Sequence, residues 1–314
     1  MKLKLTLFLI ILINTTYAYE ISPQSKIFKG KEIGTEAVHE LITYDSIKIY
    51  NENCKRLNTS SNCLENYLNL KPGRNSFIRG NWWADDPNQR LYKFSYLYFL
   101  GYMIDGRRRV NNQVIVDHTY RLHYRGHFGD MQFMHAMTSP NESTGDTRNN
   151  VLMWIEFLYK VSIGEYKRET KFSSIKINGL DLYFSRHQDW EIQWLLQPKW
   201  RLSDPNDFKY HALGALLHTL QDSYSKSHTM RTRFPSAACP YGRILGFYNY
   251  KEQTSSSHRV YDSRKAYENS IFDITSNPVS ASAKLIEFSI NKADWETEVK
   301  PYLTKVVFCI HDTS

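Results

Sequence analysis

The chain has 314 residues, of which 41% are hydrophobic, 14% aromatic and 23% charged, with a formal net charge of +8. This length is enough for one large domain or two small ones with a well-buried core. The hydrophobic content excludes a disordered chain, and a mean hydropathy of −0.53 excludes a protein with many membrane spans. The positive charge favours anionic partners such as lipid headgroups, nucleic acid or phosphate esters.

Residues 1–18 have the pattern of a secretory signal peptide. Two lysines precede the apolar run Leu5–Ile13, and small residues around Ala18 form a cleavage site. The apolar run is too short for a membrane-spanning helix. We therefore expect a mature protein of residues 19–314, folded as one domain and either periplasmic or secreted after cleavage near Ala18.

The four cysteines of an exported chain fit two disulfides. Cys54 and Cys63 lie close together around a polar loop, whereas Cys239 and Cys309 are far apart in sequence. Three pairings are possible from the sequence alone, and the spacing favours Cys54 with Cys63 and Cys239 with Cys309. No Cys-x-x-Cys motif occurs, so zinc binding or redox chemistry through thiolates is not expected.

Hydrophobic periodicity predicts an all-α protein with long loops and a small β-hairpin insertion. The predicted helices are, in chain order, 31–50, 89–104, 149–161, 207–223, 263–271 and 282–307, the last with breaks at 291–294 and at Pro301. The alternating apolar residues of 171–185, centred on Asn178–Gly179, predict the hairpin. The 30 residues after His228 are expected to form a loop.

Two His-x3-Asp pairs stand out because each places an imidazole and a carboxylate one helical turn apart. His218 and Asp222 form the first pair on the predicted helix 207–223, and His258 and Asp262 form the second. His228 lies between the pairs. Imidazole and carboxylate groups are ligands for zinc, so this pattern predicts a metal site without thiolates.

The motif Leu213-Gly214-x-x-Leu-His-x-Leu-x-Asp222, followed by His228 and by the second His-x3-Asp pair, resembles the zinc-dependent bacterial phospholipase C family. That family shares its all-helical fold and its trinuclear zinc site with secreted single-strand nucleases. The resemblance extends upstream to Asp85, in Trp-Ala-Asp, and to His39, in Val-His-Glu-Leu-Ile-Thr.

One further histidine is implied between Asp85 and the helix 149–161. His135, at the end of Gly-Asp-Met-Gln-Phe-Met-His, has the family-like distance from that helix, and His127 is its competitor. His127 and His123 are alternatively expected to orient the ligands through hydrogen bonds.

The resemblance implies two or three Zn²⁺ ions. The first would be held by Asp85, His135, His218 and Asp222, the second by His228, His258 and Asp262, and the third by His39 with a shared Asp222 and the mature N-terminus. The family often has Trp at that terminus, whereas this chain is expected to begin with Tyr19.

The implied activity is hydrolysis of the glycerol–phosphate ester of phospholipids by a metal-activated water, with Asp85 as both ligand and general base. The partners would be phospholipid and, transiently, the membrane surface, with no stable protein partner. The alternative is a zinc-dependent single-strand nuclease or nucleotidase, which would instead bind nucleic acid. The phospholipase is favoured because Ser225-Lys226-Ser227 stands where the nucleases usually have Gln-Pro-Leu. A non-enzymatic exported binding protein is a third hypothesis, and it would give the two His-x3-Asp pairs no role.

Overall fold

The computed structural model describes residues 37–57, 63–87, 105, 122–196, 205–232, 234, 236–250, 260–270 and 277–310. The expected signal peptide, the helix expected at 89–104 and His258 therefore lie outside the described residues. Within the described ranges, no helix combines the length and the hydropathy needed to cross a membrane.

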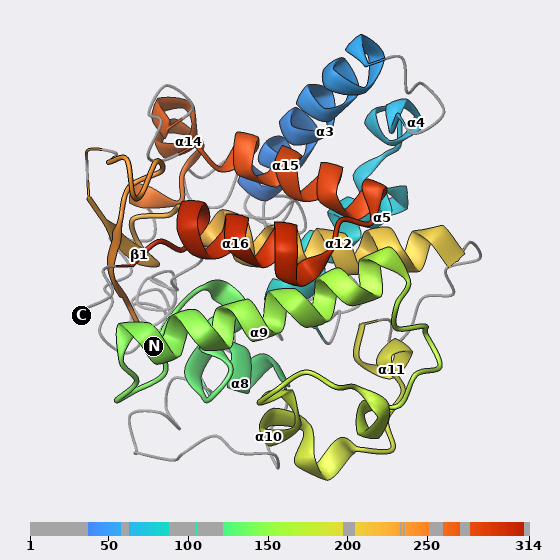
Figure 1. The fold of residues 1–314 in the computed structure, drawn as a ribbon, viewed down its shortest axis with the longest axis vertical. Coiled ribbons are helices and arrows are strands. Elements are labelled where there is room, and N and C mark those ends of the chain that lie inside the picture. The colour runs from blue at the N-terminus through green and yellow to red at the C-terminus, as the bar shows by residue number, and fades with distance from the viewer. Residues whose placement is uncertain are drawn as a thin grey trace, which may run out of the picture.

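The described part of the chain is mainly helical, with α12 at its centre (Figure 1). In chain order the elements are α3 Val38–Arg56, α4 Glu65–Leu68, η2 Pro72–Arg74, α5 Ser76–Asp85, α8 Leu122–Phe128, η3 Gln132–His135, α9 Thr144–Ile163, η4 Phe172–Ser174, α10 Leu180–Phe184, η5 Ser185–His187, α11 Ile192–Leu196, α12 Pro205–Asp222, β1 Thr229–Arg231, β2 Ile244–Phe247, α14 Arg264–Ser270, α15 Pro278–Asn291, η7 Trp295–Val299, α16 Lys300–Tyr302 and η8 Leu303–Val307. Helices α5, α9 and α15 pack against α12, and α15 also packs against α3. The predicted all-α fold class is confirmed.

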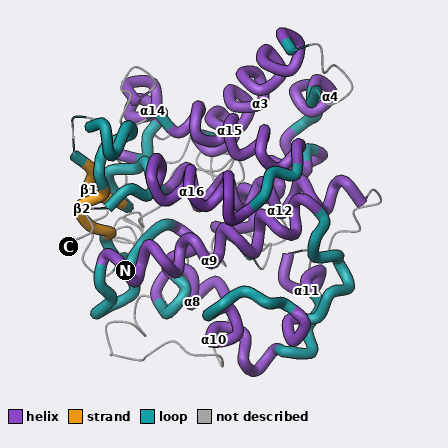
Figure 2. The backbone as a smooth tube through the Cα atoms, in the orientation of Figure 1, coloured by secondary structure: helices purple, strands orange, loops and turns teal. Residues whose placement is uncertain are grey.

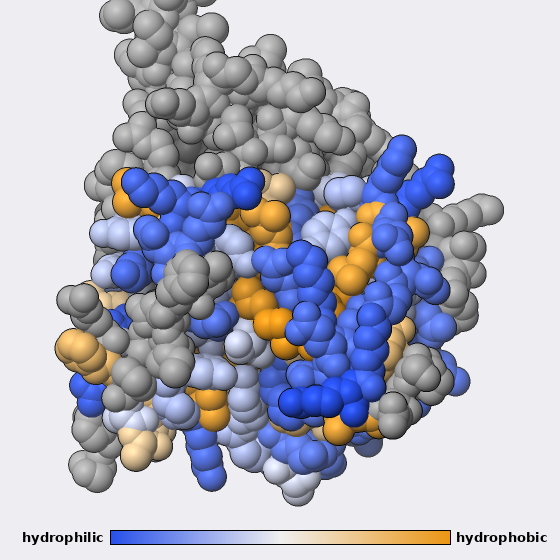
Figure 3. Space-filling model, turned by 90° about the horizontal axis from the view of Figure 1, so that it is seen from above, coloured by the Kyte–Doolittle hydropathy of each residue, from blue (hydrophilic) through white to orange (hydrophobic). Residues whose placement is uncertain are grey.

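Helix α12 is buried on nearly every side, which explains its central place. Its leucines Leu213, Leu216, Leu217 and Leu220 are all inaccessible to solvent. Residues 211–222 of the helix are all buried, so neighbouring elements cover each of its faces. On the outer face seen in Figure 3, hydrophilic side chains predominate and hydrophobic ones form only narrow strips between them.

Two glycines allow α5 and α12 to touch backbone to backbone. A Cβ atom added to Gly80 would lie 2.0 Å from the carbonyl oxygen of His211, and one added to Gly214 would lie 2.0 Å from that of Phe77. Any side chain at either position would therefore force the helices apart. This close approach brings the end of α5, with Asp85, beside the last turns of α12.

The predicted β-hairpin at 171–185 is wrong, because this segment forms short helical turns, among them α10. Ile177, Leu180 and Phe184 are buried at helical spacing, and Gly179, with φ of 86°, precedes α10 and does not connect two strands. The described strands lie instead in the region predicted to be a loop. There β1 and β2 form an antiparallel ribbon at the edge of the molecule (Figure 2).

The C-terminal helical region has one of its two predicted breaks. Helix α15 ends at Asn291, and Lys292 adopts a left-handed conformation with φ of 51°. No break occurs at Pro301, since the π-helical turn η7 leads directly into α16 and η8. Pro301 lies in the first turn of α16, where its missing N–H costs little.

Both predicted disulfides are confirmed. Cys54 at the end of α3 is bonded to Cys63, and Cys239 is bonded to Cys309 near the C-terminal end of the described chain. Two disulfides indicate folding in an extracellular or otherwise oxidising compartment.

Candidate metal centre

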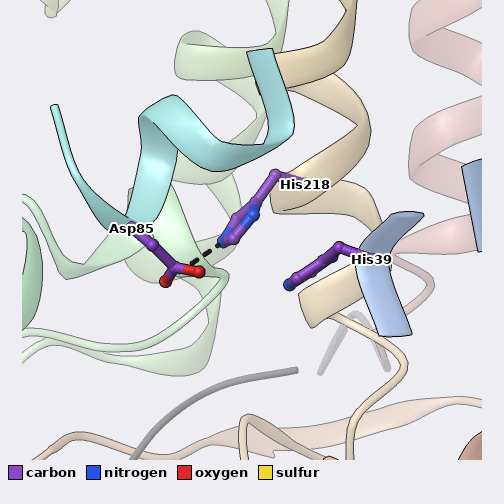
Figure 4. Close-up of side chains that lie close together, drawn as sticks. All are labelled: His39, Asp85 and His218. Atoms are coloured by element: carbon purple, nitrogen blue, oxygen red, sulfur yellow. Dashed lines mark ion pairs between the residues drawn. The ribbon is translucent and has the colours of Figure 1, made fainter. Parts of the chain in front are cut away.

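A cluster of histidines and aspartates lies in the core where four elements meet. His39 comes from α3, Asp85 from the end of α5, His135 from the end of η3, and His218 and Asp222 from α12. None of these five residues is more than 4% exposed. Figure 4 shows three of them, His39, Asp85 and His218, pointing toward one another from separate helices.

Four atoms of the cluster are spaced like the ligands of one metal ion. Nδ1 of His135, Nε2 of His218 and Oδ2 of Asp222 lie 3.0–3.1 Å from one another. Oδ1 of Asp85 lies 3.8 Å from the His218 nitrogen and 4.0 Å from the His135 nitrogen. The ligands of a tetrahedral zinc ion are about 3.3 Å apart. Histidine nitrogens and carboxylate oxygens are also suitable donors for zinc, so the residues present fit such an ion.

The remaining polar atoms of the cluster give a second reason to place a cation here. Oδ2 of Asp85, Nε2 of His135 and Nδ1 of His218 are buried without a hydrogen-bond partner among the described residues. Buried polar atoms without partners are costly. A cation would compensate the two carboxylates and give Oδ2 of Asp85 a partner, whereas the unpartnered ring nitrogens point away from the ligand nitrogens of the same rings and would not contact that cation.

The two carboxylates of the cluster differ in their electrostatics. Burial raises the pKa of Asp85 to about 7. Burial also acts to raise the pKa of Asp222, but the charges of His228 and His218 outweigh it, and the pKa lies well below its ordinary value. Asp222 is therefore the permanent anion of the cluster.

His39 is held by its neighbours on both sides of the ring. Its Nδ1 lies 2.6 Å from Oε1 of Gln221, its Nε2 lies 3.3 Å from Oδ1 of Asp222, and its ring stacks on that of His218. Burial lowers the pKa of His39, but the hydrogen bond and charge of Asp222 raise it more, so the net shift is upward.

Gln221 was missed by sequence reasoning. The sequence feature that could have revealed it is an amide side chain one helical turn after Leu217, on the buried face of the predicted helix.

His127 and His123 lie next to the cluster. His127 Nδ1 lies 3.0 Å from the carbonyl oxygen of His123, and its ring centre lies 4.7 Å from that of His135. Ligand atoms of Asp85, His127 and His135 come within 4.8 Å of one another and form a second candidate metal-binding group. Burial lowers the pKa of both His127 and His123, which keeps them in the neutral form that binds metals.

His228 and Asp262 are placed differently. Nδ1 of His228 lies 3.8 Å from Oδ2 of Asp222 and donates a hydrogen bond to the carbonyl oxygen of His135. Asp262 accepts hydrogen bonds from the hydroxyls of Ser225 and Ser227 and belongs to none of the candidate metal-binding groups among the described residues. The structure thus brings His228 to the edge of the cluster and places Asp262 against two serine hydroxyls. The second expected zinc site, which includes His258 outside the described residues, remains a prediction.

Tyr250 was also missed by sequence reasoning. Its ring centre lies 5.5 Å from that of His127, 6.2 Å from that of His135 and 6.4 Å from that of His228. Its backbone N–H donates to Oε1 of Gln132, which fixes the chain at this point. The ring therefore closes one side of the histidine cluster, although nothing in its sequence context distinguished it from the other tyrosines.

Comparison of the chain with models of known protein families, with curated proteins and with solved structures found no match. The family resemblance stays an expectation based on motifs, and the chemistry of the site is inferred from its own residues. Those residues form buried histidine–aspartate groups that could hold a metal ion.

Proposed function

We propose that the protein is a zinc-dependent hydrolase of phosphate esters, of the phospholipase C type. The observation that supports this proposal most directly is the convergence of His135 Nδ1, His218 Nε2 and Asp222 Oδ2 at 3.0–3.1 Å, with Asp85 beside them. These four residues would hold the first zinc ion. When bound, zinc would supply a Lewis acid and lower the pKa of a water molecule.

The chain's own residues have separate roles in this proposal. Asp222 keeps a negative charge beside four histidines, which favours cation binding in the core. Asp85 has one oxygen, Oδ1, near the ligand nitrogens and a second, Oδ2, without a hydrogen-bond partner among the described residues. That second oxygen is suited to orient the attacking water and to accept its proton.

A phospholipid substrate agrees with two further properties of the chain. The disulfides indicate an oxidising compartment, where a protein meets membrane surfaces and not the phosphorylated metabolites of the cytoplasm. The formal net charge of +8, which includes Lys2 and Lys4 of the expected signal peptide, stays positive without them and favours anionic substrates. Single-stranded nucleic acid satisfies the same charge requirement, so the test includes it as a competing outcome.

The test is a substrate panel with the zinc-loaded mature protein. We expect release of phosphorylated headgroup from phospholipid and little cleavage of single-stranded DNA. Asp85→Asn is expected to lower the rate by about 100-fold or more, whereas Asp189→Asn, a matched change at a site 95% exposed in its side chain, leaves it unchanged. Preferred cleavage of DNA would contradict the lipid substrate, and a zinc-loaded protein inactive on both would contradict the hydrolase.

A further inference from the structure

The β1–β2 ribbon, formed by strands Thr229–Arg231 and Ile244–Phe247, has one buried and one exposed side. Thr229 and Ile244 are 2% and 1% exposed, whereas Met230 and Leu245 are each 46% exposed. Phe234, two residues beyond the last backbone pairing of the ribbon at Thr232, is 76% exposed. Three large apolar side chains therefore face solvent on or beside this ribbon. The ribbon itself lies at the edge of the molecule (Figure 2).

The same region is purely cationic. Residues 223–250 include Lys226, Arg231, Arg233 and Arg243 and contain no aspartate or glutamate. Within the described part of the chain, Lys226 and Arg243 form no ion pair. The guanidinium of Arg231 lies over the ring of Tyr224 and donates to the carbonyl oxygen of Ser223, so no acid neutralises it there. Among the described cations Lys226 is exposed and Arg243 half-buried, whereas Arg231 packs on the buried ring of Tyr224, so the positive charge near the exposed apolar side chains comes mainly from the first two.

The ribbon is held firmly on its buried side. The Cys239–Cys309 disulfide ties its connection to the C-terminal region, and Ile244 forms a parallel bridge with Ile310. Thr232 also pairs with Arg243 through its backbone N–H and its hydroxyl. Met230 and Leu245 are therefore presented by a well-anchored element, which lowers the entropic cost of binding a surface.

The ends of the ribbon contact the candidate metal centre. His228 directly precedes β1, and its carbonyl oxygen accepts a hydrogen bond from the N–H of Tyr248, which follows β2. Tyr250, two residues further on, faces three site histidines. A surface bound by the ribbon would therefore lie beside the edge of the centre at which His228 is found.

We propose that the β1–β2 ribbon docks on an anionic lipid surface, with Met230, Phe234 and Leu245 at the boundary of headgroups and acyl chains. The choice of lipid rests in part on the proposed function. It also rests on chemistry, because two of the three exposed side chains are aliphatic and gain free energy by leaving water. Nucleic acid would instead favour stacking on aromatic rings. The neighbouring cations would attract the negative headgroups.

The test measures cosedimentation of the zinc-loaded mature protein with vesicles of phosphatidylcholine, with or without phosphatidylglycerol. We expect tighter binding to the anionic vesicles. Phe234→Ser, and separately Met230→Ser with Leu245→Ser, should each weaken it at least tenfold. Leu182→Ser on α10 is the matched control, since Leu182 is 68% exposed but distant in sequence from the ribbon. Replacing Lys226 and Arg243 by glutamine should weaken binding about fivefold per cation.

The outcomes separate docking from catalysis. Melting temperatures identify a ribbon variant that does not fold. The vesicle binding of the other ribbon variant then tests the proposal. Ribbon variants that bind vesicles like wild type would overturn the proposal, as would equal binding to neutral and anionic vesicles. Ribbon variants that lose binding to single-stranded DNA, or that no longer form a dimer, while they still bind vesicles would also overturn the proposal. Hydrolysis of a monomeric short-chain phospholipid reports on the proposed function alone, so vesicle binding without hydrolysis would leave the docking surface in place.

Discussion

Nδ1 of His39 lies 2.6 Å from Oε1 of Gln221, and both side chains are fully buried. The amide is itself fixed, since its Nε2 donates to the hydroxyl of Thr43, which also accepts a hydrogen bond from Asn81. An amide oxygen accepts only, so the proton of the neutral imidazole lies on Nδ1. When a cation replaces the second proton, on Nε2, the lone pair of that nitrogen is directed toward the cation beside Asp222.

Gln221→Leu should therefore weaken zinc binding by about 10- to 100-fold, the usual effect of losing a hydrogen bond that orients a metal ligand. Competition with a chelator of known affinity measures the change. Gln221→Glu is the conservative variant, because a carboxylate oxygen still accepts from Nδ1, and it should restore most of the affinity. Wild-type affinity in the leucine variant would show that the contact serves packing only.

Gly214→Ala should destabilise the protein by about 3 kcal/mol or more, because the new methyl group meets the backbone of α5. The added Cβ would lie 2.0 Å from the Phe77 carbonyl oxygen, which cannot move without its helix. Gly73→Ala is the matched control, with no atom within 4 Å of the added Cβ. Urea unfolding measures both. Similar unfolding midpoints for the two variants would contradict the close contact of α5 and α12.

His135→Ala should lose more zinc than His127→Ala. His135 contributes Nδ1 to the most closely spaced group of ligand atoms. Nδ1 of His127 instead donates a hydrogen bond to the carbonyl oxygen of His123. The metal content of each variant after dialysis gives the ranking. The reverse order would move the centre of the site to the group formed by Asp85, His127 and His135.

The two disulfides should contribute unequally to stability. The loop-closure model gives about 4 kcal/mol for the 70-residue separation of Cys239 and Cys309 and about 3 kcal/mol for the 9-residue separation of Cys54 and Cys63. Replacing each pair by alanine and measuring the free energy of unfolding tests the ranking. A larger loss of unfolding free energy on replacing the Cys54–Cys63 pair would indicate that native contacts around α3, and not loop entropy, determine the stabilisation.

Helices with a strong apolar stripe were predicted from the sequence with useful accuracy. Helix α12 was expected at 207–223 and is found at Pro205–Asp222. Helix α9 was expected at 149–161 and is longer, Thr144–Ile163, because the Ser143 hydroxyl caps its start and Gly164 ends it. Spacing along one helix also indicated that His218 and Asp222 share a face, and the distance of 3.0 Å between their side chains agrees.

The tertiary parts of the site could not be obtained from local pattern. Apolar alternation at 171–185 suits both a strand and short helical turns, and only the packing of Phe184 and its neighbours decides between them. The partners of Asp262 were missed because two serine hydroxyls carry no periodic signal. Tyr250 lies in a segment whose position depends on the whole fold, and Gln221, although on a predicted helix, meets His39 only because α12 packs against α3.

The metal content of the mature protein tests the central claim most directly. After purification, zinc loading and exhaustive dialysis, atomic emission should find two to three zinc ions per wild-type chain. His218→Ala, which removes a nitrogen 3.0 Å from Oδ2 of Asp222, should hold at least one fewer and lose activity with it. A wild-type chain without zinc, or a His218→Ala variant with its full content, would contradict a metal centre at this cluster.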